Sequence, residues 1–110
     1  MKNKKSVITC DMEGRIETFN EGAEQLFGYR AGEVVGKVRV SVFSPGEIVL
    51  QNVPLWLEQA SKEGVYTTNT RFVRKDGTEF SARIRVTPTF AKGKAAGQTG
   101  YCGVTEAIEE

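Results

Sequence analysis

The chain has 110 residues, which suits a single domain with one hydrophobic core, and its 39% hydrophobic and 26% charged residues exclude a disordered chain. The formal net charge of +1 gives no overall attraction to nucleic acid or to an anionic membrane, so direct contact with either is not expected. No apolar run approaches the roughly 20 residues of a membrane span, and we expect a cytoplasmic protein or a cytoplasmic part of a larger one.

Two short strands joined by a tight turn are predicted near the start of the chain. Residues 7–10 form the first strand, and the Asp-Met-Glu-Gly sequence at 11–14 forms the turn, because Gly14 tolerates a positive φ. Residues 15–19 alternate polar and apolar side chains, which is typical of a half-buried strand.

Short helices are predicted between residues 20 and 64. Asn20 can cap a first helix that ends at Gly28 and has an apolar stripe made of Ala23, Leu26 and Phe27. A weaker helical turn covers residues 32–35. The glycines of this region do not follow the spacing of a phosphate-binding loop, so we interpret them as helix ends.

Two further helical segments follow. The Ser-Pro-Gly-Glu sequence at 44–47 matches a capping box with proline in the first turn, and it predicts a helix from Pro45 to about Gln51. Pro54 opens or bends a second segment that stops at Gly64 and has one apolar face, made of Val53, Trp56, Leu57 and Ala60. Core packing is the preferred role of Trp56, and stacking on a flat ligand is the alternative.

A β-hairpin is predicted from residue 65, where the hydrophobic period changes to two. A two-residue Asp76-Gly77 turn would bring Asn69 and Arg71 onto the face of Phe80 and Ile84. A three-residue loop at 75–77 instead brings apolar side chains to that face, namely Tyr66 and Phe72. Because a one-residue slip exchanges the two faces, hydrophobic parity favours the three-residue loop.

This register makes a specific prediction about burial. The residues expected to be buried together are Phe72, Phe80, Ile84 and Val86. Arg83 and Arg85 are expected on the outer face, where they form a solvated or partner-facing surface. Thr68 and Thr70 fall on the buried face, and they serve either as ligand contacts or as ordinary strand residues with local hydrogen bonds.

The last elements complete a five-stranded fold. Residues 91–97 read as a loop, residues 101–105 as a strand, and residues 106–110 as the start of an exit helix or linker. The order is two strands, short helices and three strands. We therefore expect an α+β domain over residues 1–110, in which short helices cover one face of a five-stranded antiparallel sheet.

Histidine and cysteine limit the chemistry. Histidine is absent, so the chain holds no Ser-His or Cys-His catalytic pair and no histidine metal ligand. Cys10 and Cys102 lack metal-ligand spacing, and we expect them to be reduced thiols with small, buried side chains. No nucleophile–base pair can be named, so the sequence does not indicate an enzyme.

Three stretches together resemble the PAS sensor-domain family. They are "DMEGRIETFNEGAEQLFGYRAGEVVGK" at 11–37, "RFVRKDGTEFSARIRVTP" at 71–88 and "GYCGVTEAI" at 100–108. Their order and spacing cover nearly the whole chain. The resemblance implies a PAS-like fold in which the first and last strands are neighbours, so that Cys10 and Cys102 lie on adjacent strands.

The resemblance also implies a sensing function. Family members hold a small ligand or cofactor, or nothing, between sheet and helices, and they often form homodimers. They commonly sit within histidine kinases, cyclic-dinucleotide enzymes, chemoreceptors or transcription regulators, so an output or kinase domain is the expected partner in a parent protein.

The family's cofactors fit these residues unevenly. Haem-binding members use an axial histidine, which this chain lacks. Blue-light members carry a reactive cysteine shortly after the glycine that Gly36 resembles, and residues 38–40 here are Val-Arg-Val, so cysteinyl-flavin photochemistry is not expected. Flavin-binding members use amides on the sheet, at positions that correspond here to Phe72, Ala82 and Thr105.

Three hypotheses follow from the residues and the resemblance. The first is a sensory module that binds a small ligand and shifts the populations of its outgoing segment. The second is a flavin redox sensor of the same fold, and the third is a cofactor-free dimerisation or protein-interaction module. The residues expected to line a ligand site are Phe27, Phe43, Trp56, Leu57, Tyr66, Thr68, Thr70, Phe72, Ile84, Tyr101 and Thr105.

Overall fold

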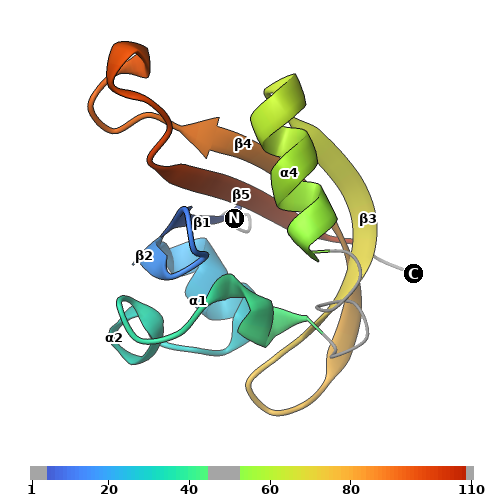
Figure 1. The fold of residues 1–110 in the computed structure, drawn as a ribbon. Coiled ribbons are helices and arrows are strands. Elements are labelled where there is room, and N and C mark those ends of the chain that lie inside the picture. The colour runs from blue at the N-terminus through green and yellow to red at the C-terminus, as the bar shows by residue number, and fades with distance from the viewer. Residues whose placement is uncertain (1–4, 45–52, 109–110) are drawn as a thin grey trace.

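A computed structural model of the protein describes residues 5–44 and 53–108 (Figure 1). One antiparallel sheet has the strand order β2-β1-β5-β4-β3. Its strands are β1 (Ser6–Asp11), β2 (Ile16–Phe19), β3 (Tyr66–Val73), β4 (Glu79–Thr89) and β5 (Gly100–Ala107). The five-stranded sheet of an α+β fold is thus confirmed, and the first and last strands are neighbours as the resemblance implied.

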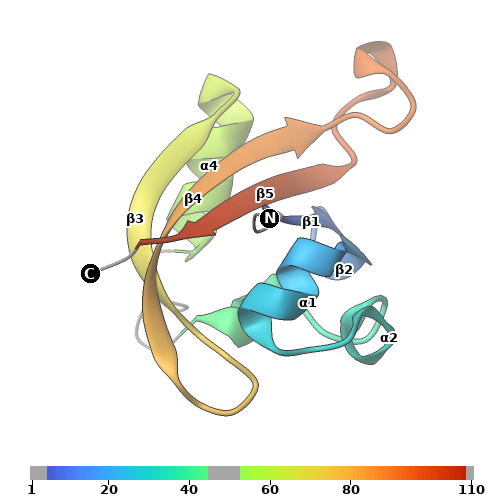
Figure 2. The same ribbon diagram turned by 180° about the vertical axis from the view of Figure 1, so that it is seen from behind.

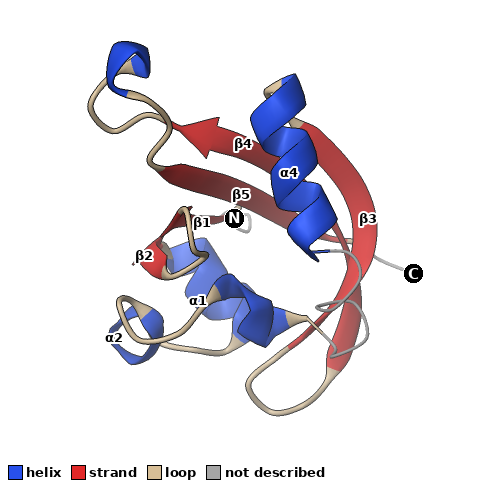
Figure 3. Ribbon diagram, in the orientation of Figure 1, coloured by secondary structure: helices blue, strands red, loops and turns tan. Residues whose placement is uncertain are grey.

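The helices in the described ranges are short; the first four pack against one face of this sheet, and the last lies exposed in the loop between β4 and β5 (Figures 1 and 2). They are α1 (Glu21–Phe27), α2 (Ala31–Val34), the 3-10 helix η1 (Val40–Phe43), α4 (Val53–Glu63) and the 3-10 helix η2 (Lys94–Ala96). Helix α1 lies against β1, and α4 crosses β3 and β4 (Figure 3). None of the helices in the described ranges is long and apolar enough to cross a membrane.

Asn20 caps α1 and also ties it to the sheet. Its Oδ1 accepts hydrogen bonds from the backbone N–H of Ala23 and of Val7, both at 2.9 Å, and its Nδ2 donates to the Lys5 carbonyl at 2.9 Å. At the other end, Gly28 has a φ of 85°, the left-handed conformation that glycine adopts without strain. Both predicted ends of this helix are confirmed.

The register of the β3–β4 hairpin is the predicted one. Phe72 pairs with Phe80, the Arg74 N–H donates to the Thr78 carbonyl at 2.8 Å, and Gly77 has a φ of 92° in a three-residue loop. The outcome for burial agrees for Phe72 and Val86 and for the two arginines, whereas Phe80 and Ile84 are half-buried. Phe72 and Val86 are buried, Phe80 and Ile84 pack against them, and Arg83 and Arg85 are exposed.

Of the other predicted helices, one is wrong, one lies outside the described residues and one is confirmed in part. The expected helix start at Glu106 is wrong, because β5 continues to Ala107, where Glu106 and Ala107 pair with Arg83 and Ala82 of the long strand β4. The predicted helix from Pro45 to Gln51, most of its capping box and the side chain of Val53 lie outside the described residues. In α4, Trp56 and Ala60 are buried on one face as predicted.

The two cysteines lie on adjacent strands but on opposite faces of the sheet. Cys10 pairs with Tyr101, and Cys102 pairs with Thr9, so the two side chains point away from each other. Both are free thiols. Burial of Cys10 raises its pKa to about 11, and burial also raises the pKa of Cys102. A disulfide between them would require the backbone to move.

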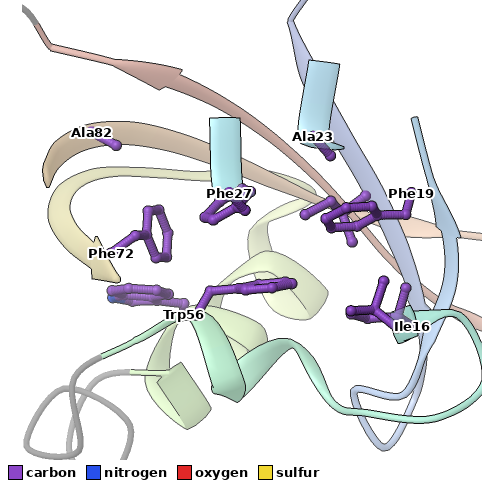
Figure 4. Packing of buried hydrophobic residues seen from close by; sticks show 10 residues of the cluster. Ile16, Phe19, Ala23, Phe27, Trp56, Phe72 and Ala82 are labelled. Atoms are coloured by element: carbon purple, nitrogen blue, oxygen red, sulfur yellow. The ribbon is translucent and has the colours of Figure 1, made fainter. Parts of the chain in front are cut away.

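Aromatic rings fill the core between α1 and the sheet (Figure 4). The ring centroid of Phe27 lies 4.5 Å from that of Phe43, 5.5 Å from Phe72 and 5.7 Å from Phe80. These separations are those of favourable aromatic pairs. Because Phe27 is the last residue of α1, this cluster holds the helix against the hairpin.

Candidate functional site

A cavity of about 60 Å³ lies between the sheet and the helices. Its floor is formed by inward-facing residues of the three central strands, among them Cys10 of β1, Ile84 of β4 and Thr105 of β5. Its opposite wall comes from the helices, through Phe27 of α1, Phe43 of η1, and Trp56 and Leu57 of α4. The cavity therefore sits where short helices meet a curved sheet.

The described part of the lining carries no charged side chain and is almost entirely apolar. Ser44 and Thr105 supply hydroxyl groups, and both residues are buried. The Tyr101 hydroxyl is already paired, because it lies 3.1 Å from the Ser61 Oγ of α4. With the pKa of its thiol raised to about 11, Cys10 stays neutral near pH 7. The cavity thus suits an uncharged guest, since an unpaired charge would be costly to bury here.

Most of the residues predicted from sequence line this cavity. The helical ones are Phe27, Phe43, Trp56 and Leu57, and the strand ones are Phe72, Ile84, Tyr101 and Thr105. The structure places Tyr66, Thr68 and Thr70 elsewhere. They share the inner face, but their edge strand β3 is half-buried there and they do not reach the cavity.

The sequence reasoning missed several lining residues, of which Gly103 shapes the cavity most directly. It lies on the inner face between Ile8 and Val86, and a Cβ built on it would meet Ile84 Cδ1 at 3.5 Å. The missing side chain therefore leaves space in the floor. The alternation of faces along β5 could have indicated that Gly103 faces the cavity, because Gly103 lies between Tyr101 and Thr105, which face it.

A flavin does not fit these residues. The cavity is less than half the volume of an apolar cavity of about 150 Å³ that accepts benzene, and a flavin ring system is larger than benzene. No amide side chain stands among the described lining residues, and Phe72, Ala82 and Thr105 occupy the sheet positions where the resemblance implied amides. In the described residues, no cluster of cysteine and carboxylate side chains could hold a metal ion.

The two helical walls are held to the sheet in different ways. At the end of α1, the Phe27 carbonyl accepts from the Lys75 N–H at 3.0 Å, and the Leu26 carbonyl accepts from Arg74 Nε at 3.0 Å. Helix α4 is held by its apolar face and by the Ser61–Tyr101 pair. The guanidinium of Arg74 also lies 4.2 Å above the Phe80 ring.

Comparisons with known proteins agree with this architecture. The PAS domain family matches residues 4–103. The Two-component system protein A of Emericella nidulans is 30% identical over 105 residues, which are 96% of this chain and 15% of that protein. The chain thus spans only about a seventh of that relative.

Solved structures share the fold at lower identity. The PAS domain of a Colwellia psychrerythraea protein superposes with a TM-score of 0.87 at 21% identity, over 94% of this chain and 86% of that one. The PAS domain of a LuxR-family transcriptional regulator from Burkholderia thailandensis, in complex with ethanol, gives 0.71 at 16% identity, over 94% and 88%. At these identities the likeness shows the fold alone.

Proposed function

Because the chain belongs to the PAS domain family, we propose that it is a cytoplasmic sensory module that binds a small, uncharged molecule in its central cavity. The observation that carries this proposal is the apolar cavity itself, which lies between the central strands and the helices. A PAS domain of the Burkholderia regulator holds ethanol, which supports a guest of similar size here.

The size of the cavity limits the class of guest. A single water occupies about 10–15 Å³ measured in this way, so about 60 Å³ accepts a molecule of only a few heavy atoms. Apolar walls favour the transfer of such a molecule out of water. We propose no catalytic step for this chain.

Strand β5 is the proposed route by which binding is passed on. Its residues Tyr101, Gly103 and Thr105 form part of the cavity floor, and the strand continues to Ala107 at its far end. A guest that binds one arrangement of β5 more tightly shifts the population toward that arrangement. The proposed recipients are an output or kinase domain of the parent protein and a second copy of this chain in a homodimer.

Filling the cavity from its floor tests the proposal. Gly103→Ala adds one methyl group in ordinary van der Waals contact with Ile84, and Gly103 does not have a positive φ, so the fold should tolerate it. Gly32→Ala is the matched control, because a Cβ at Gly32 meets nothing within 4 Å and also requires no positive φ. Both changes should stabilise the fold by about 0.4–1 kcal/mol through the unfolded chain.

The experiment measures xenon binding from the shifts that xenon causes in the backbone amide signals of NMR spectra. Wild type and Gly32→Ala should bind xenon equally, with the largest shifts at Ile8, Val86 and Gly103, and Gly103→Ala should bind it several-fold more weakly. Absence of a response in the wild type, or an equal response in all three proteins, would contradict a guest site at this cavity.

A further inference from the structure

Two buried hydroxyl residues stand opposite each other in the centre of the sheet. Ser6 of β1 pairs directly with Thr105 of β5, and both side chains lie on the inner face. Ser6 is 1% exposed and Thr105 is 3% exposed. Thr105 lines the cavity, and Ser6 lies beside it in the neighbouring strand.

Neither hydroxyl has a partner among the described residues. The Oγ atom of Ser6 is fully buried and makes no hydrogen bond there, and the Thr105 hydroxyl receives none either. Leaving such a group unpaired costs about 1–3 kcal/mol, and folded proteins rarely leave buried polar atoms in that state. Valine at position 105 would fill the same space without this cost, so a purely structural core gains nothing from the threonine.

Geometry allows the pair to act in series. The two hydroxyls form no hydrogen bond with each other in this structure. Directly opposite residues in antiparallel strands have Cβ atoms about 4.5–5.5 Å apart, so a rotation of one side chain about χ1 would let its hydroxyl donate to the other. If the Ser6 hydroxyl donates to Thr105 Oγ1, the proton of Thr105 is free to point into the cavity. Apart from the Ser44 hydroxyl, the Tyr101 hydroxyl and the Cys10 thiol, the described lining is apolar, so this proton is directed at one end of a guest.

We propose that the guest is a small neutral molecule with one hydrogen-bonding oxygen, such as a short-chain alcohol or ketone, and that Thr105 donates to that oxygen. Ser6 acts as a positioning residue, because it orients the Thr105 hydroxyl without touching the guest. This inference rests on the proposed function and narrows it to a chemical class. A carboxylate is excluded, since no described lining residue carries a positive charge that would compensate it.

The test compares a probe with one hydroxyl group, 1-propanol, and a probe with none, xenon, by NMR titration. Thr105→Val keeps the shape of the side chain and removes only the hydroxyl. It should weaken 1-propanol binding by about threefold to tenfold, which corresponds to one hydrogen bond, and leave xenon binding unchanged. Thr87→Val is the matched control, because Thr87 pairs with Cys102 on the outer face and should change neither titration.

Ser6→Ala separates positioning from structure. Removing an unpaired buried hydroxyl should leave the fold equally or more stable, whereas 1-propanol should bind about twofold to fivefold more weakly and xenon as before. A structural role would instead lower stability and affect both probes alike. Backbone amide spectra establish that each variant is folded.

The outcomes distinguish this inference from the function on which it rests. Equal 1-propanol affinity in wild type and Thr105→Val, with xenon still bound by both, overturns the role of Thr105 and leaves the cavity as a guest site. Binding of neither probe to the wild type overturns the proposed function itself. Weaker 1-propanol binding by Thr105→Val and by Ser6→Ala, with xenon binding unchanged in both, supports the inference. Unchanged 1-propanol binding by Ser6→Ala overturns its positioning role.

Discussion

Helices α1 and α4 form two walls of one cavity, and the sheet holds them by different means. Helix α1 has seven residues and is tied at both ends, by Asn20 at its start and by the Arg74–Lys75 segment at its end. Helix α4 has eleven residues and is held by its apolar face and the Ser61–Tyr101 pair. One wall is thus fixed by hydrogen bonds to its backbone in addition to packing, and the other mainly by side-chain packing.

The lengths of the two helices explain this difference. A helix of seven residues is marginal in water, and the last carbonyls of any helix lack partners within it. The hairpin loop supplies those partners to Leu26 and Phe27, so α1 becomes an extension of the sheet. Helix α4 buries Trp56 and Ala60, so it depends less on hydrogen bonds from other elements. We therefore expect the cavity to open on the α4 side, where fewer directional contacts must break.

The largest effect is expected from Phe27→Ala, which removes the ring at the centre of the aromatic cluster. Phe27 is 1% exposed, and a buried phenylalanine truncated in this way typically costs about 3–5 kcal/mol. Chemical denaturation measures the change. Leu55→Ala on the exposed side of α4 is the control and should cost far less. A loss below about 1 kcal/mol for Phe27→Ala, the size of an ordinary surface change, would refute the central role of this ring.

Arg74→Met should have the next largest effect, because it keeps the aliphatic stem and removes the bond to the Leu26 carbonyl. A hydrogen bond to a charged group contributes about 1.5–3 kcal/mol, and the half-buried position of Arg74 places the expected loss near the lower value. Hydrogen exchange should quicken in α1 and leave α4 unchanged. The control is Arg83→Met on the outer face. Equal acceleration in both helices would show that α1 is not held separately.

Tyr101→Phe should loosen the other wall by a smaller amount. It removes the hydroxyl that pairs with Ser61 Oγ, and a neutral hydrogen bond contributes about 0.5–1.5 kcal/mol. Amide exchange should rise in α4 and remain unchanged in α1. Ser61→Ala should have the same effect, and the double variant should add nothing. Additive losses would mean that the two hydroxyls act independently.

The smallest effect is expected on the rate at which the two cysteine thiols are labelled, which can be measured without changing the stability of the fold near pH 7. Cys10 packs with Ala60 of α4, and burial raises its pKa to about 11, so little thiolate forms at pH 8. Maleimide should label Cys10 far more slowly than Cys102 of the half-buried outer face. Labelling of Cys10 should accelerate in Tyr101→Phe and remain slow in Arg74→Met. The reverse order would place the opening at α1.

The sign of the pH dependence follows from the same pKa. Because the folded pKa of Cys10 lies above the ordinary value of 9.0, the unfolded chain loses this proton first as the pH rises. The contribution of Cys10 to stability should therefore be constant below about pH 9 and decline between pH 9 and about 11. Cys10→Ala should reduce that decline, which alkaline denaturation curves can measure, and the raised pKa of Cys102 accounts for a smaller part that stays. A decline of the same size in both proteins would assign it to other groups.

Features with a local cause could be predicted from sequence. The Asn20 cap, the Gly28 helix end and the loop at 75–77 each depend on a few neighbouring residues or on the parity of one hairpin. The helix expected from Glu106 failed for the opposite reason. Its residues continue β5 because β4 is long enough to pair with them, and that length is not visible in the residues themselves.

The candidate site was predicted only in part. The alternation of side chains along a strand indicates which face of the sheet a residue is on, but not where its strand lies in the strand order. Thr68 and Thr70 have the predicted orientation, but they stand on the edge strand β3, whereas the cavity lies mainly over β1, β5 and β4 and reaches β3 only at Phe72 in its described lining. The Ser6–Thr105 pair joins residues about a hundred positions apart. Only the adjacency of β1 and β5 brings those hydroxyls together.

That adjacency also determines how the domain responds to mechanical tension. The start of β1 pairs with the end of β5, and Lys5 and Glu106 form an ion pair of 3.1 Å at the same end. A force applied at these two points breaks the residue pairs between β1 and β5 one after another, starting from this end. Strands separated in this way yield at lower force than strands that are sheared along their length. The first pair to part is Ser6–Thr105, so tension would disrupt the cavity floor before the rest of the domain lost its shape.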